Sequence, residues 1–181
     1  MRPIRLLLSV SLVVGISSPV KSGEKLTVKV RAAALLAKKP RNDIRSKPLD
    51  QKPYWHVERA RIGNTRKVPV ELIVNGQSVA RKEIDASGSV RDVTFDYTPT
   101  QSSWVALRIY PTAHTNPVFV EVDGKPIRAS KKSARWCLDG VDVCWKQKAP
   151  RMRKEDLQDA KTAYDFARAA YRKILSESHA D

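Results

Sequence analysis

The sequence predicts a mainly β fold, an antiparallel Ig-like β-sandwich of about seven to eight strands followed by a C-terminal α-helical hairpin. Between residues 26 and 128, apolar and polar side chains alternate in short runs, and turn signals recur about every eight to twelve residues. After residue 129 the apolar residues recur at spacings of three and four, which is typical of amphipathic helices. We therefore divide the chain into an export signal (1–22), a β-sandwich domain (23–128) and a helical hairpin (129–181) that we expect to pack on the sandwich.

The composition of the 181 residues is that of a globular protein, with 41% hydrophobic and 29% charged residues. Two cysteines and three histidines exclude a disulfide-dense scaffold and a four-thiolate zinc site. The formal net charge is +15, which favours an acidic or polyanionic neighbour. The excess is concentrated in a Pro-rich basic loop at 37–53 and in a second group of cations between Arg128 and Arg135.

The N-terminal residues resemble an export signal. Arg2 and Arg5 precede an apolar run at 6–16, and small or medium residues then permit cleavage before Gly23. The run is shorter than the ~20 apolar residues that a transmembrane helix needs. We expect an exported protein, periplasmic or extracellular, with no transmembrane segment in the mature chain. A buried N-terminal helix is the alternative.

The strands are predicted from alternation. Leu26, Val28 and Val30 indicate a half-buried first strand. The three prolines and many charges of 37–53 indicate a long connection or an edge-covering loop. A further strand is predicted over 54–62, with Trp55, Val57 and Ile62 buried.

Two-residue turns separate the next strands. Asn75-Gly76 predicts a hairpin because both residues tolerate a positive φ. Ser87-Gly88 predicts a turn, and Asp123-Gly124 predicts a second hairpin that returns through Ile127. The remaining strands are predicted around Val68 to Val74, Val79 and Ile84, Val90 to Tyr97, Trp104 to Tyr110, and Pro117 to Val122.

The helical hairpin is predicted from capping residues and from an apolar stripe. Ser130 is a suitable N-cap for a first helix that runs past Gly140 to Trp145. Pro150 separates it from a second helix that starts near Lys154, with acids in its first turn. The stripe of the second helix comprises Leu157, Ala160, Tyr164, Ala167, Tyr171 and Ile174.

Cys137 and Cys144 are the candidates for redox or metal chemistry. Seven helical residues span about 10 Å, whereas a disulfide needs Cα atoms within about 7 Å. A continuous helix therefore forbids an internal bridge, and only a break at Gly140 would permit one. The functional interpretation is a redox pair or half a metal site. We favour the other interpretation, two small core residues.

Other chemistry has weak support in the sequence. His114 lies in a polar loop without companion ligands, so we expect no metal and no cofactor. Asp92 and Asp96 are a candidate carboxylate pair, although surface acids are the commoner case. The sequence lacks a phosphate-binding loop, a nucleophile elbow and a metalloprotease motif. Most aromatic residues fall on predicted core positions, so we expect no specific nucleic-acid binding.

Several uninterrupted runs resemble the C-terminal portion of CehA/McbA-type metallohydrolases of the PHP superfamily. They are residues 50–63 (DQKPYWHVERARIG), 66–76 (RKVPVELIVNG), 114–120 (HTNPVFV), 124–130 (GKPIRAS) and 136–145 (WCLDGVDVCW). The resemblance extends from about residue 26 to residue 178. It implies relatives whose catalytic domain, a distorted α/β barrel that binds divalent metals through His, Asp and Glu, precedes this portion.

The resemblance implies no catalytic residue in this chain, because the sequence lacks a His-x-His motif and its partner ligands. We expect a split or truncated version of the longer enzymes, a non-catalytic accessory domain that shapes or covers a metallohydrolase active site. Its partner would be a PHP-type catalytic domain, and the candidate partner or ligand contacts are His114, Thr115, Asn116, Lys131 and Lys132. One alternative is a free-standing secreted binding module for anionic glycan or phosphorylated ligands. The other is a small hydrolase in its own right.

Overall fold

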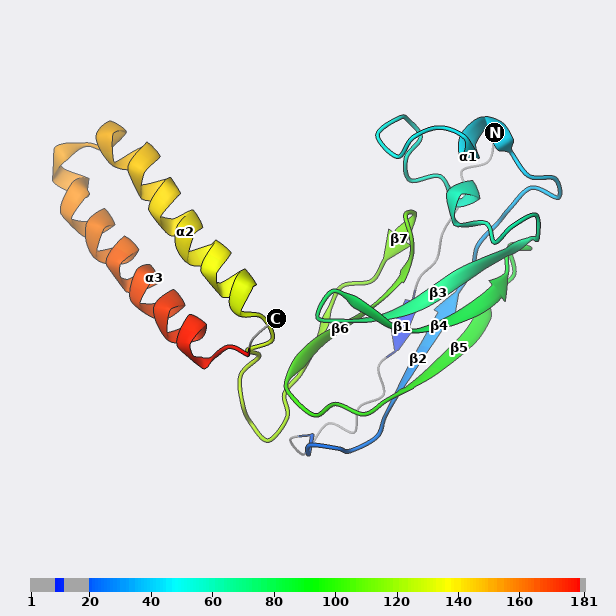
Figure 1. Cartoon of the computed structure of the whole chain (residues 1–181), viewed down its shortest axis with the longest axis horizontal. Coiled ribbons are helices and arrows are strands. Elements are labelled where there is room, and N and C mark those ends of the chain that lie inside the picture. The colour runs from blue at the N-terminus through cyan, green and yellow to red at the C-terminus, as the bar shows by residue number, and fades with distance from the viewer. Residues whose placement is uncertain (1–8, 12–19, 180–181) are drawn as a thin grey trace. The chain divides into compact units, whose positions relative to one another are not determined.

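The computed structural model describes residues 9–11 and 20–179 and divides the chain into two compact units, Met1–Lys125 and Pro126–Asp181. The predicted boundary lies close by, between residues 128 and 129. Most of the predicted export signal falls outside the described residues. The first unit holds the described strands and the second holds two long helices, so the chain combines antiparallel sheets with C-terminal helices (Figure 1). The term mainly β therefore applies to the first unit rather than to the whole chain.

A three-stranded antiparallel sheet has the order β1–β2–β5. Its strands are β1 (Ser9–Ser11), β2 (Leu26–Ala32) and β5 (Arg91–Tyr97). Val28 pairs with Phe95, and Val30 pairs with Val93, so the apolar residues of both strands lie on one face. The alternation that predicted these two strands is confirmed.

A five-stranded antiparallel sheet has the order β4–β3–β6, and both β7 and β8 pair with β6. Its strands are β3 (Lys67–Val74), β4 (Gln77–Asp85), β6 (Ser103–Ile109), β7 (Ala113–His114) and β8 (Val118–Val120). The hairpin between β3 and β4 turns at Asn75 (φ 49°) and Gly76 (φ 90°), as their residue types predict.

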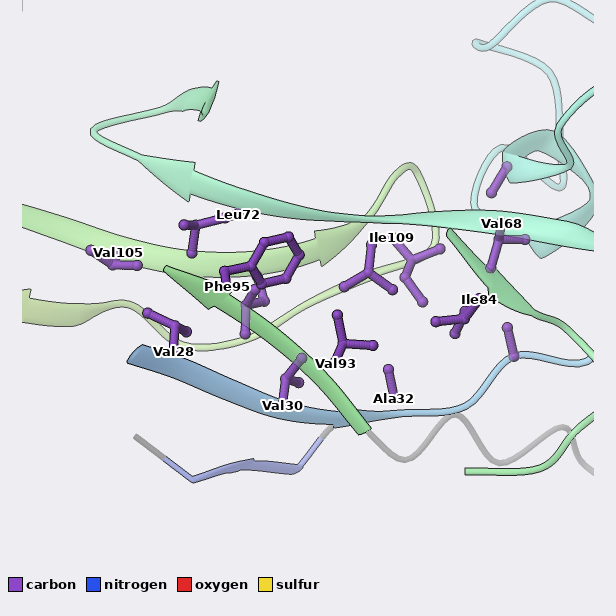
Figure 2. Close-up of a cluster of buried hydrophobic side chains, with 14 of the residues drawn as sticks. Val28, Val30, Ala32, Val68, Leu72, Ile84, Val93, Phe95, Val105 and Ile109 are labelled. Atoms are coloured by element: carbon purple, nitrogen blue, oxygen red, sulfur yellow. The ribbon is translucent and has the colours of Figure 1, made fainter. Parts of the chain in front are cut away.

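The core of the first unit is made of apolar side chains from both sheets. Figure 2 shows residues of β2 and β5 pointing toward residues of β3, β4 and β6. Its fully buried members include Leu72, Leu107 and Ile109. Successive side chains of a strand point to opposite faces of the sheet. The β6 residues that alternate with its core residues therefore lie on the outward face of the five-stranded sheet.

Two predicted features of the sheets are wrong. Residues 54–62 form no strand. They contain a 3₁₀ helix at Val57–Ala60, because the Nδ1 atom of His56 accepts the Glu58 N–H (3.0 Å) and caps that turn. Trp55, predicted to be buried, is exposed, and Ile62 is half-buried. Asp123 and Gly124 do turn with positive φ, but no strand returns through Ile127, because Pro126 has no N–H to donate to a ladder.

The connection from β2 to β3 is irregular apart from that 3₁₀ turn and one short helix, α1 (Asn42–Arg45). Side chains hold it in place, as the next subsection describes. This agrees with the long connection predicted for 37–53.

The second unit is an α-helical hairpin of α2 (Lys131–Lys148) and α3 (Leu157–Glu177). The Ser130 hydroxyl accepts the Ser133 N–H (2.9 Å), so the predicted N-cap is confirmed. Short 3₁₀ turns at Ala149–Arg151 and Lys154–Asp156 join the helices around Pro150. Arg168 of α3 donates to the Asp142 carboxylate of α2 at 2.6 Å. That the hairpin packs on the sandwich stays a prediction.

Candidate functional site

A groove of about 640 Å³ lies on the outward face of the five-stranded sheet. Trp104 and Arg108 of β6 line it because Val105, Leu107 and Ile109 face the core. The segment after β6 supplies the other walls. The residues on which the argument below depends are Trp104, Arg108, Tyr110, His114, Thr115 and Phe119.

Two of the aromatic residues that line this sheet groove, Tyr110 and Phe119, are open to solvent, and the third, Trp104, is half-buried. Phe119 is 67% exposed and Tyr110 is 52% exposed. Phe119 of β8 is the direct cross-strand partner of Trp104 of β6, so the two residues stand side by side on one face. An exposed apolar concavity of this kind is typical of a binding surface.

Arg108 gives the sheet groove a cation whose position is fixed. Its Nε donates to Glu71 Oε2 at 2.7 Å, and its guanidinium lies 5.5 Å from the centre of the Tyr110 ring. The charge is therefore largely neutralised within the protein. The groove therefore presents aromatic side chains and, at one side, the Arg108 guanidinium, which is already paired with Glu71.

The structure brings two of the five predicted contact residues, His114 and Thr115, into the sheet groove. The His114 ring donates from Nδ1 to the Thr115 carbonyl (3.0 Å), which leaves Nε2 as the acceptor of the neutral ring. The Thr115 hydroxyl accepts the Leu107 N–H (3.1 Å) and donates to the Asn116 carbonyl (2.9 Å). The Thr115 side chain therefore serves to join β6 to the following segment.

The other three predicted contact residues lie elsewhere. Asn116 is exposed beside the sheet groove but does not line it. Lys131 and Lys132 are exposed in the first turn of α2 and belong to the second unit.

Arg59 holds the basic loop by donating to four backbone carbonyls. Its Nε donates to Pro53, and its two terminal nitrogens donate to Lys47, Pro48 and Gln51 at 2.7–3.0 Å. These bonds close residues 47–53 around one planar guanidinium, a geometry that a single ammonium cannot reproduce.

A buried ion pair holds the rest of this connection. Arg61 and Glu58 are both almost fully inaccessible, and Arg61 also donates to the carbonyls of Ala37 and Thr65 at 2.8 Å. Burial raises the pKa of Glu58, but the hydrogen bonds from Arg61 and from the Arg41 N–H outweigh it, so the net pKa is lowered. Glu58 is thus a charged structural group.

The cations of the basic loop point to solvent. Lys38, Lys39, Lys47 and Lys52 are exposed, and no ion pair of the described residues uses them. Arg41 is paired with Asp43, whose pKa is lowered by that hydrogen bond. Four unpaired ammonium groups on a firmly anchored loop form a local anion-attracting surface.

The cysteines line a second groove, of about 390 Å³, between α2 and α3. Both are free thiols and half-buried, so they are not the core residues that we favoured. Helix α2 continues through Gly140, so the break that would permit an internal disulfide is absent from it. Cys144 Sγ lies 3.1 Å from the Tyr164 hydroxyl. This hydrogen bond, aided by Lys148, lowers the pKa of the thiol, and it raises the pKa of Tyr164.

The carboxylate pair is not assembled as a site. Asp92 faces Arg31 at 3.8 Å, whereas Asp96 binds Lys25 (2.8 Å) and accepts from Thr27, which lowers its pKa. Each acid thus pairs across to β2. Within residues 9–11 and 20–179, no group of three His, Cys, Asp or Glu side chains is arranged to hold a metal. In the same ranges, no helix combines the length and apolar character required to cross a bilayer.

The sequence does not predict that aromatic residues line the sheet groove. Most aromatics were assigned to the core, but Trp55, Tyr110, Phe119 and Trp136 are exposed. Trp104 carried a usable signal, because it has the opposite parity to Val105, Leu107 and Ile109 on its strand. Phe119 carried no such signal, because Val118, Phe119 and Val120 are all apolar. The sequence therefore does not indicate which of these side chains points to the core and which to solvent.

No protein-family model and no curated protein matches this sequence. The relation to CehA/McbA-type enzymes therefore stays a prediction.

Proposed function

We propose that this chain is a non-catalytic accessory binding module that uses the sheet groove to contact its partner. The observation that carries the proposal is the aromatic pair of exposed Phe119 and half-buried Trp104, set beside exposed Tyr110 and the paired cation Arg108. Exposed aromatic side chains on a rigid sheet lose little conformational freedom on binding and gain a large apolar area. A partner protein whose surface has an apolar projection surrounded by a polar rim would be complementary to this groove.

The partner that we propose is a PHP-type metallohydrolase catalytic domain, which the module would cover or shape. The supporting argument is the resemblance of five sequence runs to the C-terminal portion of such enzymes. We also propose that the first unit is an Ig-like β-sandwich and that the protein is exported. Two antiparallel sheets with a shared core support the former, and the charged start and apolar run of residues 2–16 support the latter.

The test is affinity capture from the source cells with the tagged full chain as bait. Three baits are compared: the wild type, the double variant Trp104→Ala/Phe119→Ala, and the control Phe166→Ala, which removes a still more exposed aromatic from the second unit. We expect a metallohydrolase to be captured by the wild type and the control, and to be reduced at least tenfold on the double variant, in line with loss of two aromatic contacts. Circular dichroism checks that all three baits are folded. Equal capture by all three baits would remove the sheet groove from the proposal.

A second function is favoured by the anchored basic loop. Its four unpaired lysines support binding of an anionic glycan or phosphorylated ligand, with heparin as the probe. Binding should weaken steeply as salt rises, because exposed charges are screened beyond about 8–10 Å at physiological ionic strength. Changing Lys38, Lys39, Lys47 and Lys52 to Gln should lower the eluting salt concentration. The same change at four dispersed exposed lysines, Lys29, Lys125, Lys146 and Lys154, lowers the net charge equally and is the control. Equal elution of the two variants would reject the loop as a site.

A further inference from the structure

The helical hairpin leaves much apolar surface uncovered. Among the described residues of 126–179, the buried hydrophobic side chains are Ala134 and Leu138. Trp136 and Phe166 are each 76% exposed, and Val143 is exposed as well. Two helices that bury so little gain too little from burial to offset the entropy of ordering, so a further surface must cover them.

The open face of the hairpin is the groove between α2 and α3. Cys137, Gly140, Val141 and Cys144 line it from α2, and Tyr164, Ala167 and Tyr171 line it from α3. At about 100° per residue, the charged residues of the middle of α2 fall on the other side of the helix; they are Arg135, Asp139, Asp142 and Lys146. The middle of the face therefore has no charged side chain from α2, and Lys148, beside Cys144, lies at its end, although the chain as a whole is strongly basic.

Residues 135–146 of α2 read similarly in both directions about the midpoint between Gly140 and Val141, apart from that central pair itself. Equivalent positions carry the same or similar residues, as follows: Trp136 and Trp145, Cys137 and Cys144, Leu138 and Val143, Asp139 and Asp142, and Arg135 and Lys146. When two copies of a helix pack antiparallel about a two-fold axis, a residue before the axis in one copy lies opposite a residue after the axis in the other copy. The two residues are the same number of positions from the axis. A palindromic helix face is therefore complementary to a second copy of itself.

Helix α3 has a corresponding centre. Its two groove tyrosines, Tyr164 and Tyr171, are equidistant from the point between Ala167 and Arg168. Arg168 bonds to Asp142 of α2 at 2.6 Å, so the centres of the two helices lie at nearly the same level. One two-fold axis can pass through both centres.

Gly140 is otherwise unexplained. A Cβ atom at this position would meet nothing within 4 Å in the isolated chain, and glycine in a helix interior is unfavourable relative to alanine. At a helix–helix crossing, a missing side chain lets two backbones approach closely. Gly140 lies directly beside the proposed axis.

We propose that a second copy of this chain covers this face, with α2 packed antiparallel on its equivalent about a two-fold axis between Gly140 and Val141. Helix α3 then lies beside its own equivalent, and the two hairpins make a four-helix bundle. The face is about 27 Å long and about 20 Å wide, from 1.5 Å per residue and two helix diameters. A flat face of that size measures about 540 Å², somewhat below the about 800 Å² per partner of a standard interface, so the contact is at the small end of specific interfaces.

The symmetry favours a second copy over other occupants. If the chain's own sheet unit or an unrelated protein covered this face, the contact would be asymmetric. Such a contact would give no reason for α2 to carry similar residues on both sides of a midpoint. Covering by either is an outcome of the test below and would overturn the proposal.

Register-specific disulfide trapping tests the arrangement in the full chain. The proposed axis places Cys137 of one copy opposite Cys144 of the other, whereas the two copies of Cys144 are about two turns, or about 10 Å, apart. Diamide is the oxidant: each S–S bond forms with loss of two thiol hydrogens, which reduce the azo group to a hydrazine. Wild-type chains should become cross-linked dimers.

The single variants fix the register. Cys137→Ser alone and Cys144→Ser alone should give no cross-link, because neither has the complementary thiol. An equal mixture of the two, equilibrated before oxidation, should cross-link up to about half of its dimers, since random pairing makes half of them mixed. Cross-linking of either variant alone, or none in the mixture, would overturn the proposed register.

Analytical ultracentrifugation without oxidant tests the dimer itself. The wild type should sediment at twice the mass of one chain. Gly140→Gln should weaken the dimer at least tenfold by separating the helices, although it favours the helix of each monomer. The control Asp139→Gln changes the opposite side of α2 and should leave the mass unchanged. A wild type that is monomeric at micromolar concentration, or a Gly140→Gln chain that dimerises like the wild type, would refute the proposal.

Discussion

Arg61 and Glu58 form a buried ion pair at the end of the 3₁₀ turn, with Arg61 Nη2 2.8 Å from Glu58 Oε2. Each partner also has a second task, because Glu58 accepts the Arg41 N–H and Arg61 donates to three carbonyls of the connecting loop. The pair therefore organises a segment that has almost no regular secondary structure. It also gives a physical reason for the Glu-Arg-Ala-Arg sequence at 58–61.

Removing one partner of this pair should destabilise the first unit severely. Arg61→Met leaves an uncompensated carboxylate in the interior, and we expect a loss of about 3–5 kcal/mol in the free energy of unfolding by urea. Glu58→Gln/Arg61→Met removes both charges and keeps an acceptor for Arg41, so it should recover part of that loss. A double variant that is less stable than Arg61→Met would contradict this account.

The stability of the first unit should fall as the pH drops below about 6.5. Burial lowers the pKa of His56, and Arg41 lowers it further, whereas the unfolded residue has its ordinary value near 6.5. The unfolded state therefore takes up the proton first, and unfolding becomes easier between about pH 7 and the folded pKa. The measurement is the free energy of unfolding at intervals from pH 7.5 to 5. His56→Asn keeps an acceptor for the Glu58 N–H but does not titrate, so the pH dependence due to His56 should vanish in it. The same pH slope in both proteins would count against His56.

Arg59→Lys should loosen the basic loop. A lysine ammonium cannot bridge the four carbonyls of residues 47, 48, 51 and 53, so chymotrypsin should cleave after the exposed Leu49 and Tyr54 at least several-fold faster. Mass spectrometry of the early fragments identifies the sites. Arg45→Lys, which loses one bond to Asn64, is the control and should be cleaved at the wild-type rate. Equal rates for the two variants would show that Arg59 does not anchor the loop.

Asn75 should be required to hold the backbone of Trp104, a residue of the sheet groove. Its side chain accepts the Trp104 N–H (3.1 Å) and donates to Ser103 (3.2 Å), while its φ of 49° disfavours most residues. Asn75→Gly retains the backbone conformation and loses two hydrogen bonds, a cost of about 1–3 kcal/mol. Asn75→Ala should cost about 1 kcal/mol more because of its positive φ. Urea denaturation of both variants measures the difference, and equal stabilities would mean that the backbone conformation contributes nothing.

Cys144 should ionise below the ordinary pH for a thiol. The Tyr164 hydroxyl and Lys148 both favour the thiolate. In Cys137→Ser, which leaves Cys144 as the remaining thiol, the ultraviolet absorbance of the thiolate should appear at a lower pH than the ordinary cysteine value of about 8.5. Adding Tyr164→Phe to Cys137→Ser should raise the transition, whereas Tyr171→Phe, from the same groove, should not. Insensitivity to Tyr164 would exclude the hydrogen bond as the cause.

Part of the candidate site was predictable from the sequence. His114 and Thr115 were selected as residues of a polar loop, and they do line the sheet groove. Lys131 and Lys132 were selected for charge alone, and charge does not indicate which surface a residue joins. The role of Arg59 was not predictable, because its four partners lie 6 to 12 residues away along an irregular loop.

The sequence by itself determined the elements whose signals are local. The alternation of Leu26 to Val30 and of Val68 to Val74, the Asn75-Gly76 turn and the Ser130 cap each depend on neighbouring residues, so their structures follow from the local chain. Only the tertiary structure decided the conformation of residues 54–62 and the exposure of the Phe119 side chain. An apolar run is compatible with burial on either face or with a 3₁₀ turn. The choice came from contacts distant in sequence, such as Arg61 with Ala37 and Phe119 with Trp104, whose energies no local pattern encodes.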